Sequence, residues 1–349
     1  MDQITASRVL RNPEPAASLP PNLKSDYDDL KGLVERAGLL DKQLSYYIGN
    51  ITIRLALLTG SVAFLLFFDN FWLQLLNAAF LAFAFAQIGF LGHDAGHKQI
   101  FAGSSWNYLF GLLPNLLLGL SRGWWVDTHN EHHSNPNDLA RDPHTRLPIF
   151  AFSEDQALSK QGLPRLLIRY QALYFFPILL LEGIGTKAAS IQYLLGNKGK
   201  SRLLEALLMA LHLVIYVVLV LYALGPGQAV AFIVVHQALF GLYLGLVFAP
   251  NHKGMPLLDG DSQLGFLRSQ VRTSRDIMAH PITDFWYGGL NYQIEHHLFP
   301  WMPRNKLREA QVIVRAFCEE RSIPYYETSA ARSLKEIYQY LRDVSAPVR

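Results

Sequence analysis

The sequence predicts an all-α integral membrane protein with four transmembrane helices in two hairpins and a cytoplasmic helical cap that carries a metal site. Half of its 349 residues are apolar and only 17% are charged, whereas about a quarter of the residues in soluble domains are charged. Four apolar stretches are long enough to cross a bilayer, which takes about 20 residues of helix. These stretches are residues 51–68, 71–91, 203–224 and 228–249.

Very short turns join the apolar stretches in pairs. Asp69 and Asn70 separate the first two stretches, and the Gly-Pro-Gly sequence at residues 225–227 separates the last two. All 31 lysines and arginines lie outside these turns. Because cytoplasmic loops carry the excess of lysine and arginine, we expect both termini in the cytoplasm. The cytoplasmic cap then consists of residues 92–202 and 250–349.

The other segments are assigned by composition. Residues 1–24 hold four prolines among small polar residues and predict a flexible N-terminal tail. Residues 25–349 are expected to form a single membrane domain that begins with an amphipathic surface helix. Residues 106–120 and 163–181 are apolar but interrupted by polar or basic residues, so we expect both segments to lie in the membrane plane. Cys318 is the single cysteine, which rules out an intramolecular disulfide.

Three histidine clusters lie just outside the long apolar segments. Residues 92–97 are GHDAGH, residues 129–133 are HNEHH and residues 293–297 are QIEHH. Positions i, i+3 and i+4 share one face of a helix, so the side chains within each cluster converge. A further histidine follows the fourth apolar stretch. The candidate metal ligands are His93, His97, His129, His132, His133, His252, Gln293, His296 and His297.

This set of side chains favours metal binding. Neutral imidazole suits zinc, copper, iron and nickel, and nine candidates exceed the three or four protein ligands of one metal ion. A single histidine beside an apolar helix is usually a hydrogen-bonded interfacial residue. Three clusters of matched spacing on one side of the membrane instead predict two metal ions. The net charge of +3 gives no reason to expect a nucleic-acid partner.

The three clusters resemble the histidine boxes of the membrane fatty acid desaturases. The sequence QIEHHLFP at residues 293–300, with glutamine in place of the first histidine of the box, is similar to the front-end acyl-lipid or acyl-CoA subgroup. The resemblance covers about residues 50–305. It implies a di-iron centre that uses dioxygen and two electrons to introduce a cis double bond into an acyl chain. It makes the box histidines and His252 iron ligands and leaves open whether Gln293 ligates directly, through water, or only orients a neighbour.

The resemblance also implies substrates and partners. The substrate would be an acyl lipid, an acyl-CoA or an acyl-carrier conjugate. Many front-end members carry a fused cytochrome b5 domain with a His-Pro-Gly-Gly haem motif, which this sequence lacks. We therefore expect a separate electron donor, either ferredoxin or cytochrome b5 with its reductase. A multi-pass protein of a bacterial inner membrane fits the missing haem domain.

Residues near the boxes are expected to support the ligands. Ligating imidazoles usually donate their second N–H to an outer partner that orients the ring. Candidates for this role are Asp94, Asn130, Glu131, Asp138, Asp142 and Glu295. The acyl chain needs an apolar tunnel, and the candidates for its lining are Trp124, Trp125, Trp286 and Tyr287. The alternative for these aromatic residues is the belt at the membrane interface.

Two other functions remain open from the sequence. An acyl or carotenoid hydroxylase would use the same histidine boxes, and only its product would distinguish it from a desaturase. A non-catalytic zinc-binding membrane protein or transporter belongs to a different class. A transporter should place ionisable residues along a path through the bilayer midplane, whereas these histidines gather at one face.

Overall fold

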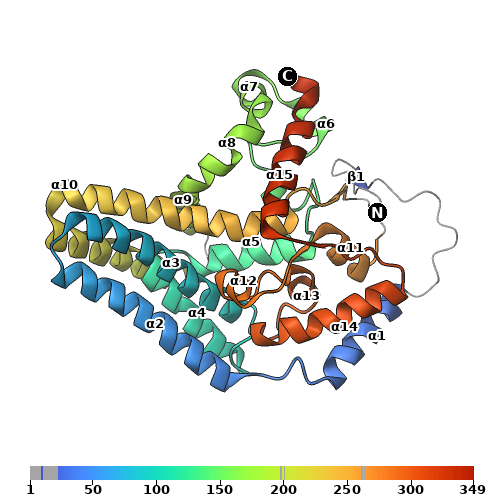
Figure 1. Ribbon diagram of the computed structural model, residues 1–349, viewed down its shortest axis with the longest axis horizontal. Coiled ribbons are helices and arrows are strands. Elements are labelled where there is room, and N and C mark those ends of the chain that lie inside the picture. The colour runs from blue at the N-terminus through green and yellow to red at the C-terminus, as the bar shows by residue number, and fades with distance from the viewer. Residues whose placement is uncertain (1–8, 11–22, 197–198, 200, 261, 263) are drawn as a thin grey trace. The chain divides into compact units, whose positions relative to one another are not determined.

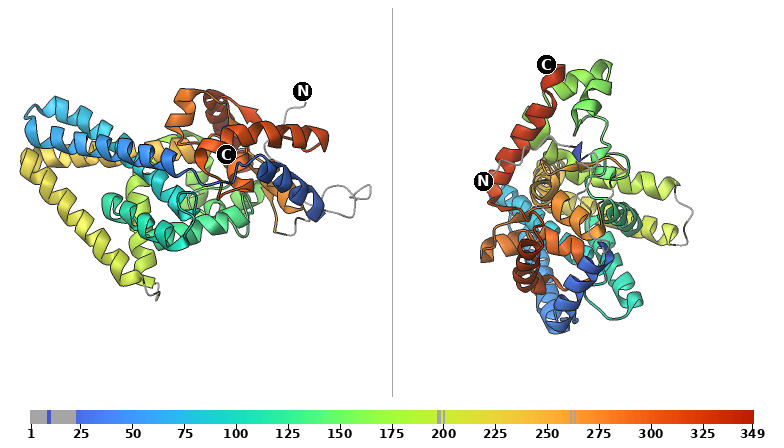
Figure 2. Two further views of the ribbon diagram at one scale, coloured as in Figure 1. Left: turned by 90° about the horizontal axis from the view of Figure 1, so that it is seen from below. Right: turned by 90° about the vertical axis from the view of Figure 1, so that its right-hand side faces the viewer.

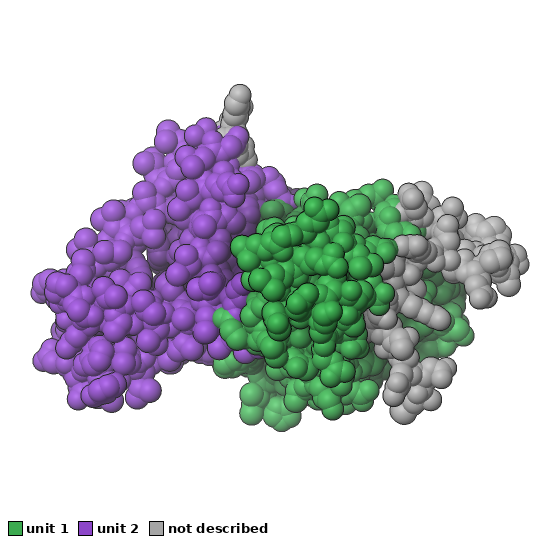
Figure 3. All heavy atoms as spheres, turned by 90° about the horizontal axis from the view of Figure 1, so that it is seen from above, with its two compact units in different colours: residues 1–41, 128–177, 247–349 green, residues 42–127, 178–246 purple. Residues whose placement is uncertain are grey.

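The computed structural model describes residues 9–10, 23–196, 199, 201–260, 262 and 264–349, and it is mostly helical, as predicted (Figure 1). The chain divides into two compact units (Figure 3). Unit 1 comprises Met1–Asp41, Thr128–Pro177 and Val247–Arg349, and unit 2 comprises Lys42–Asp127 and Ile178–Leu246. Each unit is assembled from segments that are far apart in the sequence.

The first predicted hairpin is present in unit 2. Helix α2 (Leu44–Phe67) and helix α3 (Phe71–Gly96) are joined by a short turn. The Asn70 side chain caps α3 by accepting a hydrogen bond from the backbone N–H of Leu73 at 3.1 Å, a role that asparagine favours at helix N-termini. Helix α3 continues past the predicted end of its span at residue 91, so His93 lies on its last turn.

Unit 2 also contains α4 (Ser104–Leu118), the first residues of α5 (Arg122–Ser134) and α9 (Glu182–Gly196). Helix α4 packs closely against the end of α3. A Cβ atom at Gly92 would lie only 2.8 Å from the ring of Pro114, so the absence of a side chain permits this approach. The packing of α4 thereby fixes the end of α3 that carries the first histidine cluster.

Helix α10 (Arg202–His252) contains both spans of the second predicted hairpin. Its backbone leaves the helical conformation at Gly225, where φ is 69° and ψ is 171°. Glycine adopts positive φ without steric cost. Figure 2 shows the sharp bend that results. The Gly-Pro-Gly sequence therefore reverses the chain between the two apolar halves, as expected, and the second half ends at His252.

Four helices are long and apolar enough to cross a membrane: Leu44–Phe67, Phe71–Gly96, Gln171–Gly196 and Arg202–His252. The third of these differs from the prediction, which placed residues 163–181 in the membrane plane. It runs through α8 (Gln171–Ile178), the 3-10 helix η2 (Leu179–Leu181) and α9. The interruption at Pro177 obscured its length in the sequence.

Unit 1 consists mainly of short helices. They are α1 (Leu23–Arg36), η1 (Pro143–Thr145), α6 (Glu154–Ser159), α7 (Gly162–Arg169), α11 (Phe266–Thr273), α12 (Pro281–Trp286), α13 (Gln293–Leu298), η3 (Arg304–Lys306), α14 (Leu307–Glu320), α15 (Ala330–Val344) and η4 (Ala346–Val348). Two parallel pairs of two-residue strands join them: β1 (Val9–Leu10) with β2 (Leu257–Leu258), and β3 (Asp276–Ile277) with β4 (Glu327–Thr328). Apart from β1 and the start of α1, the predicted tail at residues 1–24 lies outside the described residues.

The core of unit 1 surrounds the short helix α13. Its apolar side chains Ile294 and Leu298 are fully buried in a cluster with Val34 of α1, Val271 of α11 and Val314 of α14. A six-residue helix is not stable alone, since helix nucleation is costly and short helices depend on tertiary packing. Burial on three neighbouring helices therefore holds the third histidine cluster in place.

Candidate metal centre

Three buried imidazoles converge within unit 1. His132 lies on α5, His252 ends α10 and His297 lies on α13. Their ligand nitrogens all lie within 4.8 Å of one another. The three residues are distant in sequence, so the fold of unit 1 creates the group.

The hydrogen-bond partners of the His132 and His252 rings show which ring nitrogen carries the proton. The Nδ1 atom of His132 lies 2.9 Å from Asp142 Oδ2, and Nδ1 of His252 lies 3.1 Å from the carbonyl oxygen of Thr273. Both oxygens only accept hydrogen bonds, so each Nδ1 is protonated and donates. The Nε2 atom of each neutral ring then carries a lone pair, which is the form that binds a metal ion.

The third ring is oriented by a glutamine. Gln270 donates through Nε2 to the carbonyl oxygen of His133 at 2.9 Å, which fixes the orientation of its amide. Its Oε1 atom therefore accepts a hydrogen bond from Nδ1 of His297 at 2.8 Å. His297 thus also directs Nε2 to the group. An outer oxygen acceptor for each imidazole is the usual arrangement around bound metal ions.

The distance between two of these nitrogens fits a shared metal ion. Nε2 of His132 and Nε2 of His252 lie 3.3 Å apart. Two unprotonated ring nitrogens at this distance repel each other unless a cation lies between them. Nitrogen ligands at about 2.1 Å from one tetrahedral ion lie about 3.4 Å apart. The donor set and its spacing therefore fit a metal ion of the kind that prefers imidazole.

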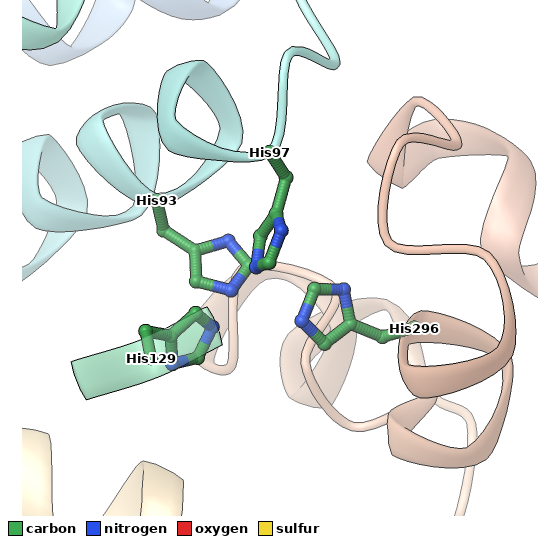
Figure 4. A group of neighbouring side chains, drawn as sticks. All are labelled: His93, His97, His129 and His296. Atoms are coloured by element: carbon green, nitrogen blue, oxygen red, sulfur yellow. The ribbon is translucent and has the colours of Figure 1, made fainter. Parts of the chain in front are cut away.

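Three other box histidines gather beside this group in unit 1. Nε2 of His129 lies 3.0 Å from Nε2 of His133, and the ring of His296 lies 4.7 Å from the ring of His133 between centroids. The ring of His133 also stacks on His297 at 4.1 Å. Figure 4 shows His129 projecting from α5 and His296 from α13. All five box-two and box-three histidines are consequently neighbours.

The first cluster forms a pair within unit 2. The rings of His93 and His97 lie 4.7 Å apart between centroids, side by side at the end of α3 (Figure 4). Trp125 packs edge-to-face against them, at 5.3 Å from His93 and 5.8 Å from His97. Burial lowers the pKa of His97 well below its ordinary value of 6.5, and the neighbouring His93 lowers it further. His97 is therefore neutral at pH 7 and able to act as a ligand.

Trp125 occupies this position because α3 has a glycine opposite it. A Cβ atom at Gly96 would lie 2.2 Å from the indole ring of Trp125, which is impossible without displacement. The glycine in the first box thus makes room for the tryptophan that covers His93 and His97. Trp125, which the sequence suggested as a tunnel residue, has its ring in contact with these candidate ligands.

The Gln293 side chain contacts two residues, His252 and Asn251. Its Nε2 atom lies 2.9 Å from Nε2 of His252. Its Oε1 atom accepts a hydrogen bond from the Asn251 amide at 3.0 Å. Asn251 was not among the predicted site residues, although it directly precedes His252 in the sequence.

Comparison with known proteins shows to which family the chain belongs. The family described as fatty acid desaturase matches residues 70–329, a range that contains all three histidine clusters. The chain belongs to the fatty acid desaturase family. It is 30% identical to an acyl-lipid (9-3)-desaturase of Physcomitrium patens over 336 residues, covering 93% of this chain and 63% of the relative. The chain thus spans somewhat less than two thirds of the length of that relative.

Two further desaturases show similar identity. A Delta(8)-fatty-acid desaturase of Euglena gracilis is 31% identical, covering 94% of this chain and 81% of the relative. A Delta(8)-fatty-acid desaturase of Helianthus annuus is 30% identical, covering 88% of this chain and 70% of the relative. These proteins are oxidoreductases of lipid metabolism. Their sources are a moss, a euglenoid and a flowering plant, so the relatives give no support to the predicted bacterial origin.

The outer partners of the desaturase histidines differ in part from those proposed from the sequence. Asp142 is the carboxylate that meets His132. Asp138 instead caps a turn, accepting hydrogen bonds from the backbone N–H groups of Ala140 and Arg141 at 2.8 and 2.9 Å. Asn130 and Glu131 are exposed, and Glu131 pairs with an arginine, Arg146, at 3.4 Å.

The charge state of Asp142 follows from its surroundings. Burial by itself would raise the pKa of Asp142, but its interaction with the adjacent His132, which donates a hydrogen bond to it, brings the pKa below the ordinary value. Asp142 also accepts from the backbone N–H groups of Asn137 and His144 at 2.8 and 2.9 Å. The carboxylate is therefore ionised and fully hydrogen-bonded, and it fixes the His132 ring.

Asp94 and Glu295 occupy different surroundings. The Asp94 carboxylate lies 3.4 Å from Nδ1 of His93, as proposed for an outer partner. Glu295 is fully buried and accepts a hydrogen bond from the hydroxyl of Tyr325 at 3.0 Å. Burial raises the pKa of Glu295 well above its ordinary value, and the nearby carboxylate of Asp276 raises it further. Glu295 is thus a buried core residue that links α13 to the Tyr325 segment.

The remaining aromatic candidates are dispersed. Trp286 is 41% exposed on α12. Tyr287 is buried, and burial raises the pKa of its hydroxyl to about 12. Trp124 is half-buried, and its backbone N–H donates to the Ser121 hydroxyl at 3.1 Å. Trp125, by contrast, has its ring in contact with the candidate ligands His93 and His97.

Proposed function

We propose that this protein is a dioxygen-dependent fatty acyl desaturase whose histidine clusters hold two iron ions. The observation that supports this most strongly is the group formed by His132, His252 and His297, in which every Nδ1 is tied to an oxygen acceptor. The ligand nitrogens of the three rings lie within 4.8 Å of one another in a buried site. This spacing suits imidazoles that share one cation.

The proposed ligand set follows from this geometry and from the family. His132, His252 and His297 would hold one iron, and His129, His133 and His296 contribute neighbouring imidazoles. The resemblance to the family extends the set to the pair His93 and His97. These donors are all neutral nitrogen ligands, which suit iron.

Bound iron would supply the dioxygen chemistry that removes two hydrogens from adjacent carbons of an acyl chain. The protein residues have the supporting tasks of binding, orienting and tuning. Asp142, Thr273 and Gln270 hold the imidazole rings at fixed angles. Trp125 covers the first histidine pair with an apolar surface, and the near-complete burial of the histidines excludes bulk water.

The substrate is proposed from the relatives together with the membrane helices. The moss relative is named as acting on acyl lipids and two others on fatty acids, so an acyl chain carried by a membrane lipid is the substrate class that we favour. The third box with glutamine suggests a front-end position for the new double bond. Two electrons would come from a separate ferredoxin or cytochrome b5, and both termini would lie in the cytoplasm.

Analysis of fatty acids by gas chromatography and mass spectrometry tests this function. A host that expresses the wild-type chain should contain a new unsaturated fatty acid, and a host that expresses the His132→Ala, His133→Ala double variant should not. A hydroxylated product would favour the hydroxylase alternative. Coexpression with cytochrome b5 and its reductase, or with ferredoxin, supplies the donor, and no product under both conditions would contradict the proposal.

A further inference from the structure

The side chain of Asn251 has one possible amide orientation. It is fully buried, and its Nδ2 atom lies 3.1 Å from the carbonyl oxygen of Val247 and 3.0 Å from that of Leu290. Carbonyl oxygens only accept hydrogen bonds. The atom of Asn251 that faces them must therefore be the NH2 group, because the opposite assignment would place three oxygens together.

This orientation dictates the orientation of Gln293. The same NH2 group of Asn251 faces one terminal atom of the Gln293 amide at 3.0 Å. That atom must be Oε1, since a second NH2 group would oppose the first. The other terminal atom, Nε2, then faces Nε2 of His252 at 2.9 Å.

The tautomer of His252 leads independently to the same result. Its Nδ1 donates to the carbonyl oxygen of Thr273 at 3.1 Å, so its Nε2 carries a lone pair and accepts a hydrogen bond. An oxygen of Gln293 at this position would repel the lone pair, whereas an NH2 group donates to it. Both ends of the Gln293 amide thus require the same orientation.

We propose that Gln293 is a hydrogen-bond donor at the metal centre and not a metal ligand, and that Asn251 holds it in that role. Its only ligating atom, Oε1, faces Asn251, and an amide NH2 group does not bind metal ions. A metal ion bound to Nε2 of His252 would take up the lone pair that the amide now contacts. The Gln293 N–H group would then be available to donate a hydrogen bond to a non-protein ligand at the centre, such as water.

The inference rests on the proposed function, because it concerns the ligands of the proposed metal. It differs from the direct ligation that a histidine at the first position of this box would provide. Gln293 is buried at 4% exposure, so solvent cannot substitute for the missing hydrogen-bond donor in a variant. If Gln293 only donates a hydrogen bond, its substitution should leave the bound metal per chain unchanged. If Gln293 is a ligand, the same substitution should lower it.

Metal stoichiometry of purified protein is the first test. Wild type, Gln293→Leu and His297→Ala are each saturated with cobalt(II) alone, and bound cobalt is measured by mass spectrometry. Gln293→Leu should bind as much cobalt per chain as wild type, with the absorption spectrum showing an unchanged coordination number, whereas His297→Ala should bind less. A cobalt loss in Gln293→Leu equal to that in His297→Ala would overturn the proposal. Wild type that binds no cobalt would contradict the proposed function itself.

Turnover measurements show whether the hydrogen bond donated by Gln293 contributes to activity. Removing a hydrogen-bond partner around a metal site typically costs about 10–100-fold in activity, and we expect a loss of that size for metal-loaded Gln293→Leu. Wild-type turnover in this variant would overturn the donor role. If the variant does not fold, an experimental structure of the zinc-loaded wild type gives the answer. A Gln293 Oε1–zinc distance of about 2.1 Å would contradict the inference, and Oε1 hydrogen-bonded to Asn251 would support it.

Discussion

Nε2 of His132 and Nε2 of His252 face each other at 3.3 Å although the two residues are 120 positions apart in the chain. His132 comes from the last turn of α5 and His252 is the last residue of α10. Each ring is fixed from behind by an oxygen acceptor. The structure thus brings two imidazole nitrogens to a spacing that suits a shared cation, and most of the expected behaviour of the protein follows from this pair.

Asp142 should matter much more than Asp138. In Asp142→Asn, the new NH2 group would oppose one of the donors that now reach the carboxylate, so the His132 ring loses its fixed orientation. We expect about a 10–100-fold loss of metal affinity or activity. Asp138→Asn is the matched control, because an asparagine Oδ1 can still accept from the two backbone N–H groups of the turn. Equal effects of the two substitutions in a metal titration would contradict the assigned roles.

A methyl group at Gly96 should disturb the first histidine pair. Its Cβ would lie 2.2 Å from Trp125, and overpacking of this kind typically costs about 1–3 kcal/mol. Gly96→Ala should therefore lower the thermal unfolding temperature in detergent and reduce metal binding. Gly60→Ala on α2 is the control, since nothing lies within 4 Å of the added atom. A stable, fully metallated Gly96→Ala protein would show that Trp125 does not contact the pair as described.

Arg275 should be essential for the position of His252. It is 1% exposed, donates to Glu336 at 2.7 Å, and also donates to the carbonyl oxygens of Pro250 and Lys253 on either side of His252. Leaving a buried polar group without its hydrogen-bond partner typically costs about 1–3 kcal/mol, so Arg275→Met, which removes the donor of both carbonyl oxygens, should unfold at lower temperature and bind metal weakly. Arg315→Met is the control, because the pair of Arg315 with Glu327 is partly exposed and such pairs contribute about 0–1 kcal/mol.

Metal removal should destabilise the protein. A ligand at 100 times its dissociation constant stabilises the folded state by about 2.7 kcal/mol. Dialysis against a chelator should therefore lower the unfolding temperature, and added iron(II) or cobalt(II) should restore it. The His252→Ala variant should show a smaller response. An unfolding temperature that is unaffected by chelation in the wild type would argue that the clusters hold no metal.

The sequence allowed prediction of those features that depend on local patterns. Apolar length and turn residues placed the hairpin at Asn70 and the reversal at Gly225. Box spacing identified the histidines that are gathered in unit 1. The length of the helical run Gln171–Gly196 was not anticipated, because Pro177 and the basic residues before it interrupt the apolar pattern without ending the run.

The outer partners could not be derived in the same way. Thr273 contributes only its backbone carbonyl. Every residue has this group, so the residue type at this position does not reveal the contact. Gln270 reaches His297 across 27 positions, and the choice of Asp142 over Asp138 depends on how the loop after α5 folds. Asn251 contacts Gln293 across 42 positions. Such pairs follow from tertiary packing, which the spacing of a motif does not encode.

The iron content of the purified chain tests the central claim most directly. Protein expressed in iron-replete cells, purified without chelators and analysed by mass spectrometry with Mössbauer spectroscopy, should contain two irons per chain in a nitrogen-rich environment, and the His132→Ala, His133→Ala variant should contain fewer. Wild-type protein that holds zinc alone, or an iron content unchanged by the double substitution, would contradict the account.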